Sequence, residues 1–318
     1  MASKQFLAMV GAGFALVASL IIGTNVHEDM YGLFKSARGR VLNIYGEERT
    51  AKYLLSFRYI PENFDGILLG SSVSDNLETK ELPGYHVYNA SINGGNTADL
   101  IPIAGNVFRE GRFKLTIICI HRYLTNDHLA KTDLMTPRQY WGALGSPQLT
   151  AAYLSRLASQ RGIVSSDYNE FGTLRFTTED DTLKTRKEID KAVAEVQEGT
   201  ASVGDYHIDP MAFADLGDLI RTARNRSDRL VIFYPPIPAP ILAIRSKEFM
   251  EYTGTMNQLL DPTDIVVDFN APEYQNMRAD YRNFVDAVHL SNRGAQQLMR
   301  ELSKAIGDSD GDRRASLH

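Results

Sequence analysis

The sequence predicts an α/β fold in which helices cover both faces of a central parallel sheet of about five strands. Five apolar runs of four to six residues, rich in β-branched and aromatic side chains, have the length and composition of strands buried between two layers. They alternate with segments of helical periodicity, which favours parallel pairing through right-handed crossovers. The expected strands are 66–70, 86–89, 115–120, 229–234 and 265–269, and the expected helices are 97–109, 147–160, 182–198, 210–225, 240–260 and 292–306.

The composition is that of a globular protein with a mildly acidic surface. The chain has 318 residues, 43% of them apolar, and a net charge of −5, and no basic stripe marks it as a nucleic-acid-binding protein. Cys119 is the only cysteine, so no intramolecular disulfide forms, and its place in the run 115–120 predicts a buried thiol. The seven histidines show neither HExxH nor Cys/His spacing, so we expect no metal ion and no other cofactor.

Residues 6–23 form an uncharged, apolar stretch near the N-terminus, FLAMVGAGFALVASLIIG. Its length lies in the lower range for a bilayer-spanning helix of about 20 residues and exceeds the apolar core of about 7–15 residues in a signal peptide. We therefore expect 1–24 to be an uncleaved transmembrane anchor, with a cleaved signal peptide or a buried soluble helix as alternatives. Lys4 favours a cytoplasmic N-terminus, which predicts a single-pass inner-membrane protein whose domain lies in the periplasm.

The rest of the chain is expected to form a juxtamembrane stalk at 25–63, one domain at 64–306 and a disordered, polar tail at 307–318. Within the domain, the charged segment 126–207 is long for a crossover. It suggests a helical insertion over the carboxyl ends of the strands, where sites form in such sheets, and a plain solvated helical layer is the alternative. The prolines of 234–240 pre-shape an extended loop that is either a pocket wall or a stiff connection.

Two polar motifs have the residues of nucleophilic catalysis. Ser72 stands in GSSVS at 70–74, directly after the first expected strand, where a serine hydroxyl is exposed and its N–H is free at a helix start. Asp286 and His289 stand three residues apart in DAVHL at 286–290, a spacing at which the carboxylate orients the imidazole as a general base. Taken singly, a helix-capping serine and a surface loop histidine explain these motifs as well.

A third motif, NASINGGNT at 89–97, follows the second expected strand and opens the next helix. Paired glycines there let a backbone N–H approach a ligand closely, and a turn followed by a helix cap is the structural alternative.

Together the three motifs resemble those of the SGNH, or GDSL, hydrolase superfamily, in the same order and strand context over about residues 64–306. The resemblance implies a three-layer, flavodoxin-like fold with Ser72, Asp286 and His289 as the catalytic triad. It also implies that the N–H groups of Ser72 and Gly94 form part of the oxyanion hole. The α/β-hydrolase elbow G-x-S-x-G fits less well, because Ser74 replaces its last glycine.

Two departures from the superfamily pattern affect the expected site. The third block of the superfamily, Gly-x-Asn-Asp, supplies an asparagine to the oxyanion hole, whereas here the strand 115–120 leads into HRYLTND at 121–127. Tyr123 and Asn126 are candidate donors in its place, and Arg122 is a candidate donor or substrate-binding residue. Ser71 replaces the aspartate of the first block, which resembles the Gly-Ser-Ser variant of membrane-anchored relatives linked to cell-envelope polymers.

These resemblances predict a membrane-anchored serine esterase or O-acyltransferase that acts on acyl, most simply acetyl, esters of an envelope or exported polysaccharide. The expected partners are the acylated carbohydrate, the membrane, and a membrane-bound acyltransferase or polysaccharide export machinery. Two alternatives stay open, a non-enzymatic component of a polysaccharide assembly that keeps the fold and a soluble cytoplasmic esterase.

Overall fold

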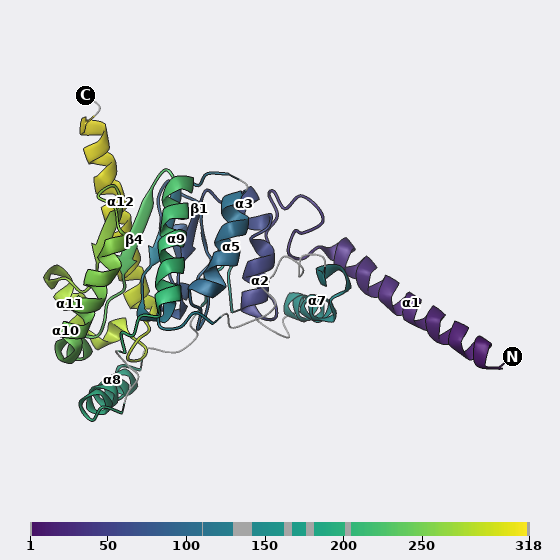
Figure 1. Cartoon of the computed structure of the whole chain (residues 1–318), viewed down its shortest axis with the longest axis horizontal. Helices are drawn as coiled ribbons and strands as arrows, with labels where there is room; N and C mark the ends of the chain where they lie inside the picture. The colour runs from purple at the N-terminus through teal and green to yellow at the C-terminus, as the bar shows by residue number, and fades with distance from the viewer. Residues whose placement is uncertain are drawn as a thin grey trace.

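A single parallel sheet forms the centre of the molecule. The computed structural model describes residues 2–109, 111–129, 142–161, 167–175, 181–200 and 205–316. Five parallel strands lie in the order β2-β1-β3-β4-β5 (Figure 1), which is the order of flavodoxin-like sheets. Each lies within one residue of its predicted bounds, so the predicted α/β fold is confirmed. The strands are β1 (Gly66–Leu69), β2 (Val87–Asn89), β3 (Leu115–Cys119), β4 (Leu230–Tyr234) and β5 (Ile265–Asp268).

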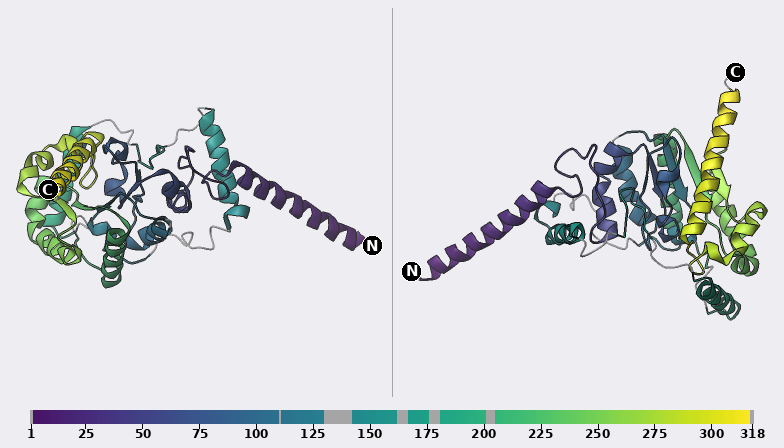
Figure 2. Two further views of the ribbon diagram at one scale, coloured as in Figure 1. Left: turned by 90° about the horizontal axis from the view of Figure 1, so that it is seen from above. Right: turned by 180° about the vertical axis from the view of Figure 1, so that it is seen from behind.

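Helices cover both faces of the sheet (Figures 1 and 2), and the strands are apolar on both faces. In β4, Leu230 and Ile232 belong to one half of the core and Val231 and Phe233 to the other, as the alternation of side chains along a strand requires. The run LVIFY is apolar throughout because neither face meets water. The first face packs against α2 (Glu48–Leu55), α3 (Tyr59–Asn63), α5 (Thr97–Arg109) and α9 (Pro210–Arg226), and the second against α4 (Ser72–Asp75), α11 (Gln275–Ala279) and α12 (Asn292–Ser316). Helix α8 (Thr182–Gln197) packs mainly against the 3₁₀ turn Tyr281–Asn283 and the helix Ala239–Met256.

The long helices begin where the sequence signals a start. α7 (Pro147–Gln160) and α9 each have proline in the first turn, and the side chains of Ser146 and Asp209 accept hydrogen bonds from first-turn N–H groups. The helix predicted at 240–260 is α10 (Ala239–Met256), which is followed by a short 3₁₀ turn. The other 3₁₀ turns are η1 (Thr79–Glu81), η2 (Arg122–Leu124), η3 (Ala143–Gly145), η5 (Pro272–Tyr274) and η6 (Tyr281–Asn283).

The N-terminal helix α1 (Ala2–Glu28) extends away from the body of the molecule (Figure 1) and carries the apolar stretch 6–23. By length and composition it is able to cross a membrane, and none of its apolar window is buried, so the alternative of a buried core helix is wrong. Its last turn is fastened to the domain. Asn25 Nδ2 donates to Ala143 O (3.2 Å) and Ser146 O (3.3 Å), and Thr150 Oγ1 donates to Asn25 Oδ1 (3.3 Å).

The segment 25–63, predicted to be a stalk, is part of the domain. Its apolar side chains are buried, and α2 and α3 lie on the first face of the sheet. The stalk prediction is wrong because these apolar residues are spread over loops and two short helices, so no regular period shows that they enter the core. The buried members between α1 and α2 are Met30, Tyr31, Leu33, Ala37, Leu42 and Ile44.

The insertion predicted at 126–207 falls partly outside the described residues, and its described parts lie in different places. α7 packs against the end of α1 (Figure 1), and the segment 167–175 packs beside β2, where the Asn89 N–H donates to Phe171 O (2.7 Å). α8 lies beside the loop that follows η6, because Thr185 Oγ1 donates to the carbonyl groups of Phe284 and Val285 (both 3.3 Å). Of these parts, α8 has the predicted position near the carboxyl ends of the strands.

The C-terminal helix α12 continues well past its predicted end at residue 306. The tail predicted to be disordered is therefore helical through Ser316, and 317–318 lie outside the described residues. Once a helix exists, each further residue gains a hydrogen bond without a new nucleation step, so a polar sequence without proline extends it.

Candidate active site

The backbone turns sharply between β1 and α4 and presents Ser72; we call residues 70–75 the nucleophile turn. At Gly70 a Cβ atom would meet Ser74 Oγ and lie 3.0 Å from the Cβ of Cys119, so the chain passes this point only without a side chain. Ser71 is fully buried, whereas Ser72 is partly exposed. Ser72 is therefore the serine at the start of this turn that a substrate reaches.

Asp286 and His289 lie between η6 and α12 on residues 284–291, which we call the histidine loop. Its own backbone closes this loop, since the Val285 N–H donates to His289 O (3.0 Å). Inside this loop Asp286 Oδ1 accepts from the N–H groups of Val288 and His289, both at 2.7 Å. The loop backbone therefore fixes the carboxylate independently of the imidazole.

The structure brings the three residues of the predicted triad together. Ser72 Oγ lies 3.0 Å from His289 Nε2, and His289 Nδ1 lies 2.8 Å from Asp286 Oδ2. Asn76 follows α4 directly and donates to Leu290 O (2.9 Å), which joins the nucleophile turn to the histidine loop. Side chains 217 residues apart in the sequence thus meet at the carboxyl end of the sheet.

Hydrogen bonds determine the charge of Asp286. Burial by itself raises the pKa of this carboxyl, but hydrogen bonds from His289 and from the Val288 N–H outweigh burial and hold the pKa below its ordinary value. The ionised carboxylate accepts a hydrogen bond from the protonated Nδ1 of His289, which leaves the lone pair of Nε2 directed at Ser72. The arrangement has the polarity of a general base that acts on a serine hydroxyl.

The segment after β2, which we call the glycine loop (residues 91–95), lies beside the nucleophile turn. Ser71 and Ile92 form a parallel bridge, and the Ile92 N–H donates to Gly70 O (3.0 Å). Gly94 has φ +61°, a left-handed conformation that favours glycine. The predicted oxyanion glycine therefore stands on the strand connection that borders Ser72 on one side.

On the other side of the nucleophile turn, His121 follows the end of β3. β3 pairs in parallel with β1, with Leu69 opposite Ile118, so both strands end at the same edge of the sheet, and His121 lines a pocket with Ala287 and Val288 of the loop that carries His289. His121 was not among the residues predicted from the sequence, which were Arg122, Tyr123 and Asn126.

The surroundings of His121 favour one neutral tautomer. Burial, together with the nearby charge of Arg122, holds the pKa of His121 well below its ordinary value. Nδ1 accepts from the Tyr123 N–H (3.5 Å), so the proton of the neutral ring is on Nε2. The ring of His121 therefore has one N–H donor, at Nε2.

The other candidates after β3 have contacts of their own. The hydroxyl of Tyr123 accepts from Arg122 Nη2 (3.0 Å), and the guanidinium of Arg122 lies 4.4 Å from the centre of the Tyr123 ring. Asn126 lies beyond η2, where its backbone N–H donates to Arg122 O (3.0 Å). These contacts use neither the hydroxyl hydrogen of Tyr123 nor the side-chain amide of Asn126, so both stay candidate donors.

A pocket lies beside the histidine loop at this end of the sheet. The proline segment at 235–238 forms one wall, so the interpretation of 234–240 as a pocket wall is supported. Arg122 and His121 both line the pocket, which fits the prediction that Arg122 contacts substrate. The remaining lining residues are Tyr206, Ile241, Ala287 and Val288.

Two further sequence predictions concern ligands and the thiol. Within the part of the chain that the structure describes, no group of three or more His, Cys, Asp or Glu side chains is arranged to hold a metal ion. Cys119 is fully buried in β3, so the prediction of a buried thiol is confirmed, and burial raises the pKa of this thiol.

No protein-family profile matches the sequence, and no curated protein matches it either. Solved structures match in fold. A protein from Streptococcus pneumonia whose description relates it to platelet activating factor has 12% identity and a TM-score of 0.43, with 82% of this chain and 90% of that chain covered. An acetylxylan esterase from Geobacillus stearothermophilus has 12% identity and a TM-score of 0.39, with coverages of 76% and 93%. A single-residue variant of an acetyl xylan esterase from the same organism has 13% identity, a TM-score of 0.40 and coverages of 76% and 94%.

Proposed function

We propose that this chain is a serine esterase or O-acyltransferase that works through an acyl-serine intermediate. The observation that carries the proposal is the chain of two hydrogen bonds, 3.0 Å from Ser72 Oγ to His289 Nε2 and 2.8 Å from His289 Nδ1 to Asp286. A nucleophile, a base and a residue that orients the base, each within hydrogen-bond distance of the next, are the parts that acyl transfer needs.

In the proposed reaction Ser72 Oγ attacks the carbonyl carbon of an ester while His289 Nε2 takes the hydroxyl proton. The tetrahedral intermediate collapses, its alcohol leaves with the proton from His289, and the acyl group stays on Ser72. Water or an acceptor hydroxyl then attacks the acyl-serine, again with His289 as the base. The two outcomes, hydrolysis and transfer, differ only in this last nucleophile.

Three N–H donors surround Ser72 in this proposal, the backbone N–H groups of Ser72 and Gly94 and the Nε2–H of His121. They belong to the three neighbouring segments that follow β1, β2 and β3, and in this proposal all three N–H groups point at the oxyanion that forms at Ser72. One donor of this kind typically contributes about 10²–10³ in rate, because it is aimed where negative charge develops. In this proposal His121 is the side-chain donor of the oxyanion hole, the role that the sequence suggested for Tyr123, Asn126 or Arg122.

For the substrate, we propose an acyl ester, most simply acetyl, of an envelope or exported polysaccharide. The support is the Gly-Ser-Ser form of the nucleophile motif and the apolar helix α1, which is exposed and long enough to hold the domain at a membrane. In this proposal α1 is a single-pass inner-membrane anchor and the domain lies in the periplasm. The proposed partners are the acylated polymer and a membrane-bound acyltransferase or export machinery.

The alternative of an inactive component with the same fold predicts a triad out of register. The distances between Ser72, His289 and Asp286 argue against this alternative. We therefore propose the enzyme.

A fluorophosphonate probe tests the proposal, because it reacts with an activated serine. The full chain, solubilised in detergent, is compared with Ser72→Ala and His289→Ala, and turnover of p-nitrophenyl acetate is measured on the same samples. Ser71→Ala is the matched control, since this neighbouring serine is buried. We expect labelling of the wild type and of Ser71→Ala, and none of the other two variants. Labelling that persists in Ser72→Ala, or no labelling of the wild type, would overturn the proposal.

A further inference from the structure

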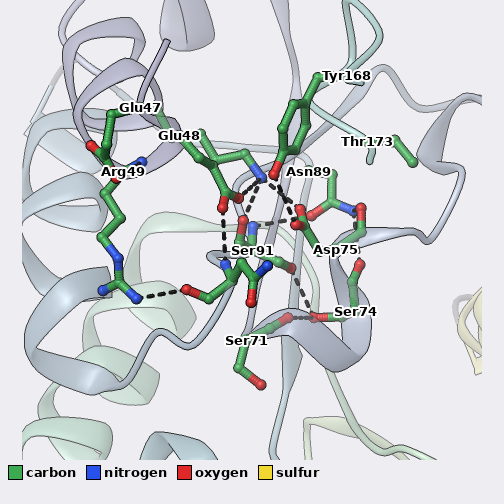
Figure 3. A network of polar contacts seen from close by, with 12 residues as sticks. Glu47, Glu48, Arg49, Ser71, Ser74, Asp75, Asn89, Ser91, Tyr168 and Thr173 are labelled. Atoms are coloured by element: carbon green, nitrogen blue, oxygen red, sulfur yellow. Dashed lines mark hydrogen bonds and ion pairs between the residues drawn. The ribbon is translucent and has the colours of Figure 1, made fainter. Parts of the chain in front are cut away.

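Helix α2 carries charged side chains that reach the site from outside the triad. Figure 3 shows Glu48 and Arg49 of this helix among the residues of the nucleophile turn and of the glycine loop. The helix belongs to the N-terminal segment and packs on the first face of the sheet, so no step of the proposed reaction uses it directly. Its contacts with both backbone segments next to Ser72 call for an explanation.

The ammonium group of Lys52 joins these segments. It is completely buried and lies 2.7 Å from Asp75 Oδ1 at the end of α4 and 2.9 Å from Glu48 Oε1 on its own helix. It also donates to Ser91 O in the glycine loop. Three acceptors on three segments match the three N–H donors of an ammonium group. Lys52 therefore ties the nucleophile turn to the glycine loop.

Two other side chains of α2 hold the residue before Gly94. Glu48 Oε2 accepts from the Asn93 N–H (3.1 Å), and Arg49 Nη2 donates to Asn93 O (2.6 Å). Arg49 is itself held by an ion pair with Asp99 (2.5 Å). Both backbone polar groups of Asn93 are thus bonded to α2.

The bond to the Asn93 oxygen also orients Gly94. The carbonyl of Asn93 and the N–H of Gly94 belong to one planar, trans peptide unit, so the oxygen and the N–H point in opposite directions. Because Arg49 holds the oxygen on its side, the Gly94 N–H is directed away from Arg49. The guanidinium therefore controls the direction of the peptide donor that the proposed oxyanion hole uses.

Stability alone explains these contacts poorly. Removing an ammonium group and two carboxylates from water is unfavourable, and apolar residues of similar size often replace such groups without loss of stability. What apolar residues do not supply is a directional bond to a chosen backbone carbonyl or N–H group. The three contacts with the glycine loop are all of this directional kind, two with carbonyls and one with an N–H.

We propose that Glu48, Arg49 and Lys52 are positioning residues that hold the Gly94 N–H and the nucleophile turn in the geometry of oxyanion binding. The inference rests on the proposed serine chemistry and adds a residue set that acts through Gly94 without touching substrate. A small displacement of an oxyanion donor weakens the transition state more than the bound ester, so loss of these contacts lowers kcat with little effect on KM.

Arg49→Met is the principal test, because Arg49 is partly accessible and methionine keeps most of its apolar stem. Turnover of p-nitrophenyl acetate by the full chain in detergent gives kcat and KM, and thermal unfolding gives Tm. We expect kcat to fall about 10–100-fold with KM within about threefold of the wild type. Arg49→Lys keeps one donor for Asn93 O and is expected to recover part of kcat. Lys52→Met, measured where it folds, is expected to behave like Arg49→Met.

Lys114→Met is the matched control. Lys114 makes an ion pair of similar length with Asp65 (2.8 Å), but at the start of β3, the opposite end of the sheet. We expect its kcat to equal that of the wild type.

Three results overturn the inference. A kcat of Arg49→Met equal to that of Lys114→Met, in a wild type whose turnover needs Ser72, would refute positioning and leave the serine chemistry intact. A parallel loss of kcat and Tm without rescue by Arg49→Lys would show a purely structural role. Turnover that does not need Ser72 would remove the proposed function and this inference together.

Discussion

Replacing Asp286 by asparagine tests how the histidine loop prepares the base. Oδ1 of Asp286 accepts both backbone N–H groups at 2.7 Å, and Oδ2 faces His289 Nδ1 at 2.8 Å. Asparagine has one oxygen and one NH₂ group. Because an NH₂ group cannot face two N–H donors, its oxygen takes the place of Oδ1 and its NH₂ faces Nδ1. His289 must then accept at Nδ1 and carry its proton on Nε2, where it no longer takes a proton from Ser72.

In a Ser-His-Asp enzyme the wrong tautomer lowers kcat about 10⁴-fold while the geometry stays intact. We expect a loss of this size for Asp286→Asn, seen in p-nitrophenyl acetate turnover and in the rate of fluorophosphonate labelling, with Tm near that of the wild type. Asp280→Asn is the control. This nearby carboxylate pairs with Arg282 (2.7 Å) and Arg293 (2.9 Å) and is bonded to neither Ser72 nor His289, so kcat should stay within about twofold.

Two results would contradict the expected effect of Asp286→Asn. If Asp286→Asn keeps kcat within about tenfold of the wild type, Asp286 does not set the tautomer of His289. If Asp280→Asn loses as much activity as Asp286→Asn, the loss reports a disturbed loop and not a change at the imidazole.

Two further changes test other parts of the structure. His121→Ala is expected to lower kcat by about 10²–10³-fold and His121→Asn to restore part of it through a new N–H donor; full kcat in the alanine variant removes His121 from the oxyanion hole. Gly70→Ala places a Cβ against Ser74 Oγ and is expected to reduce the free energy of unfolding by about 1–3 kcal/mol in urea titration, whereas Gly111→Ala, which meets open space, should have no such effect.

The fold was predictable because each buried strand has a local signature. LVIFY at 230–234 and LTIIC at 115–119 are apolar on both faces. The short length and the apolar composition of these strands are both visible in a window of five residues. The segment 25–63 lacks such a signature. Tyr31 and Ile44 enter the core from loops, and their burial depends on surfaces that other parts of the chain provide. The periodicity of the local sequence does not show that a residue packs against a distant segment of the chain.

The candidate site divides in the same way. Ser72 and the pair Asp286 and His289 stand in motifs a few residues long, so their chemistry was readable from the sequence. The position of His121 relative to Ser72 depends on how β1 and β3 pair, and this pairing is not visible in either strand alone. Lys52 lies in ERTAKYLL, where it resembles a surface lysine of an amphipathic helix, and its acceptors come from 23 and 39 residues away.

The junction between α1 and the domain has a consequence for orientation. Asn25 is bonded to Ala143, Ser146 and Thr150, so the last turn of the helix is held against the segment 143–150 at several points. A flexible tether would let the domain rotate freely beneath a bilayer. With α1 in a bilayer, by contrast, the tilt of the helix sets the direction in which the pocket faces. Membrane helices adjust their tilt to the thickness of the lipid layer. The lipid composition around α1 would then influence the direction in which Ser72 faces.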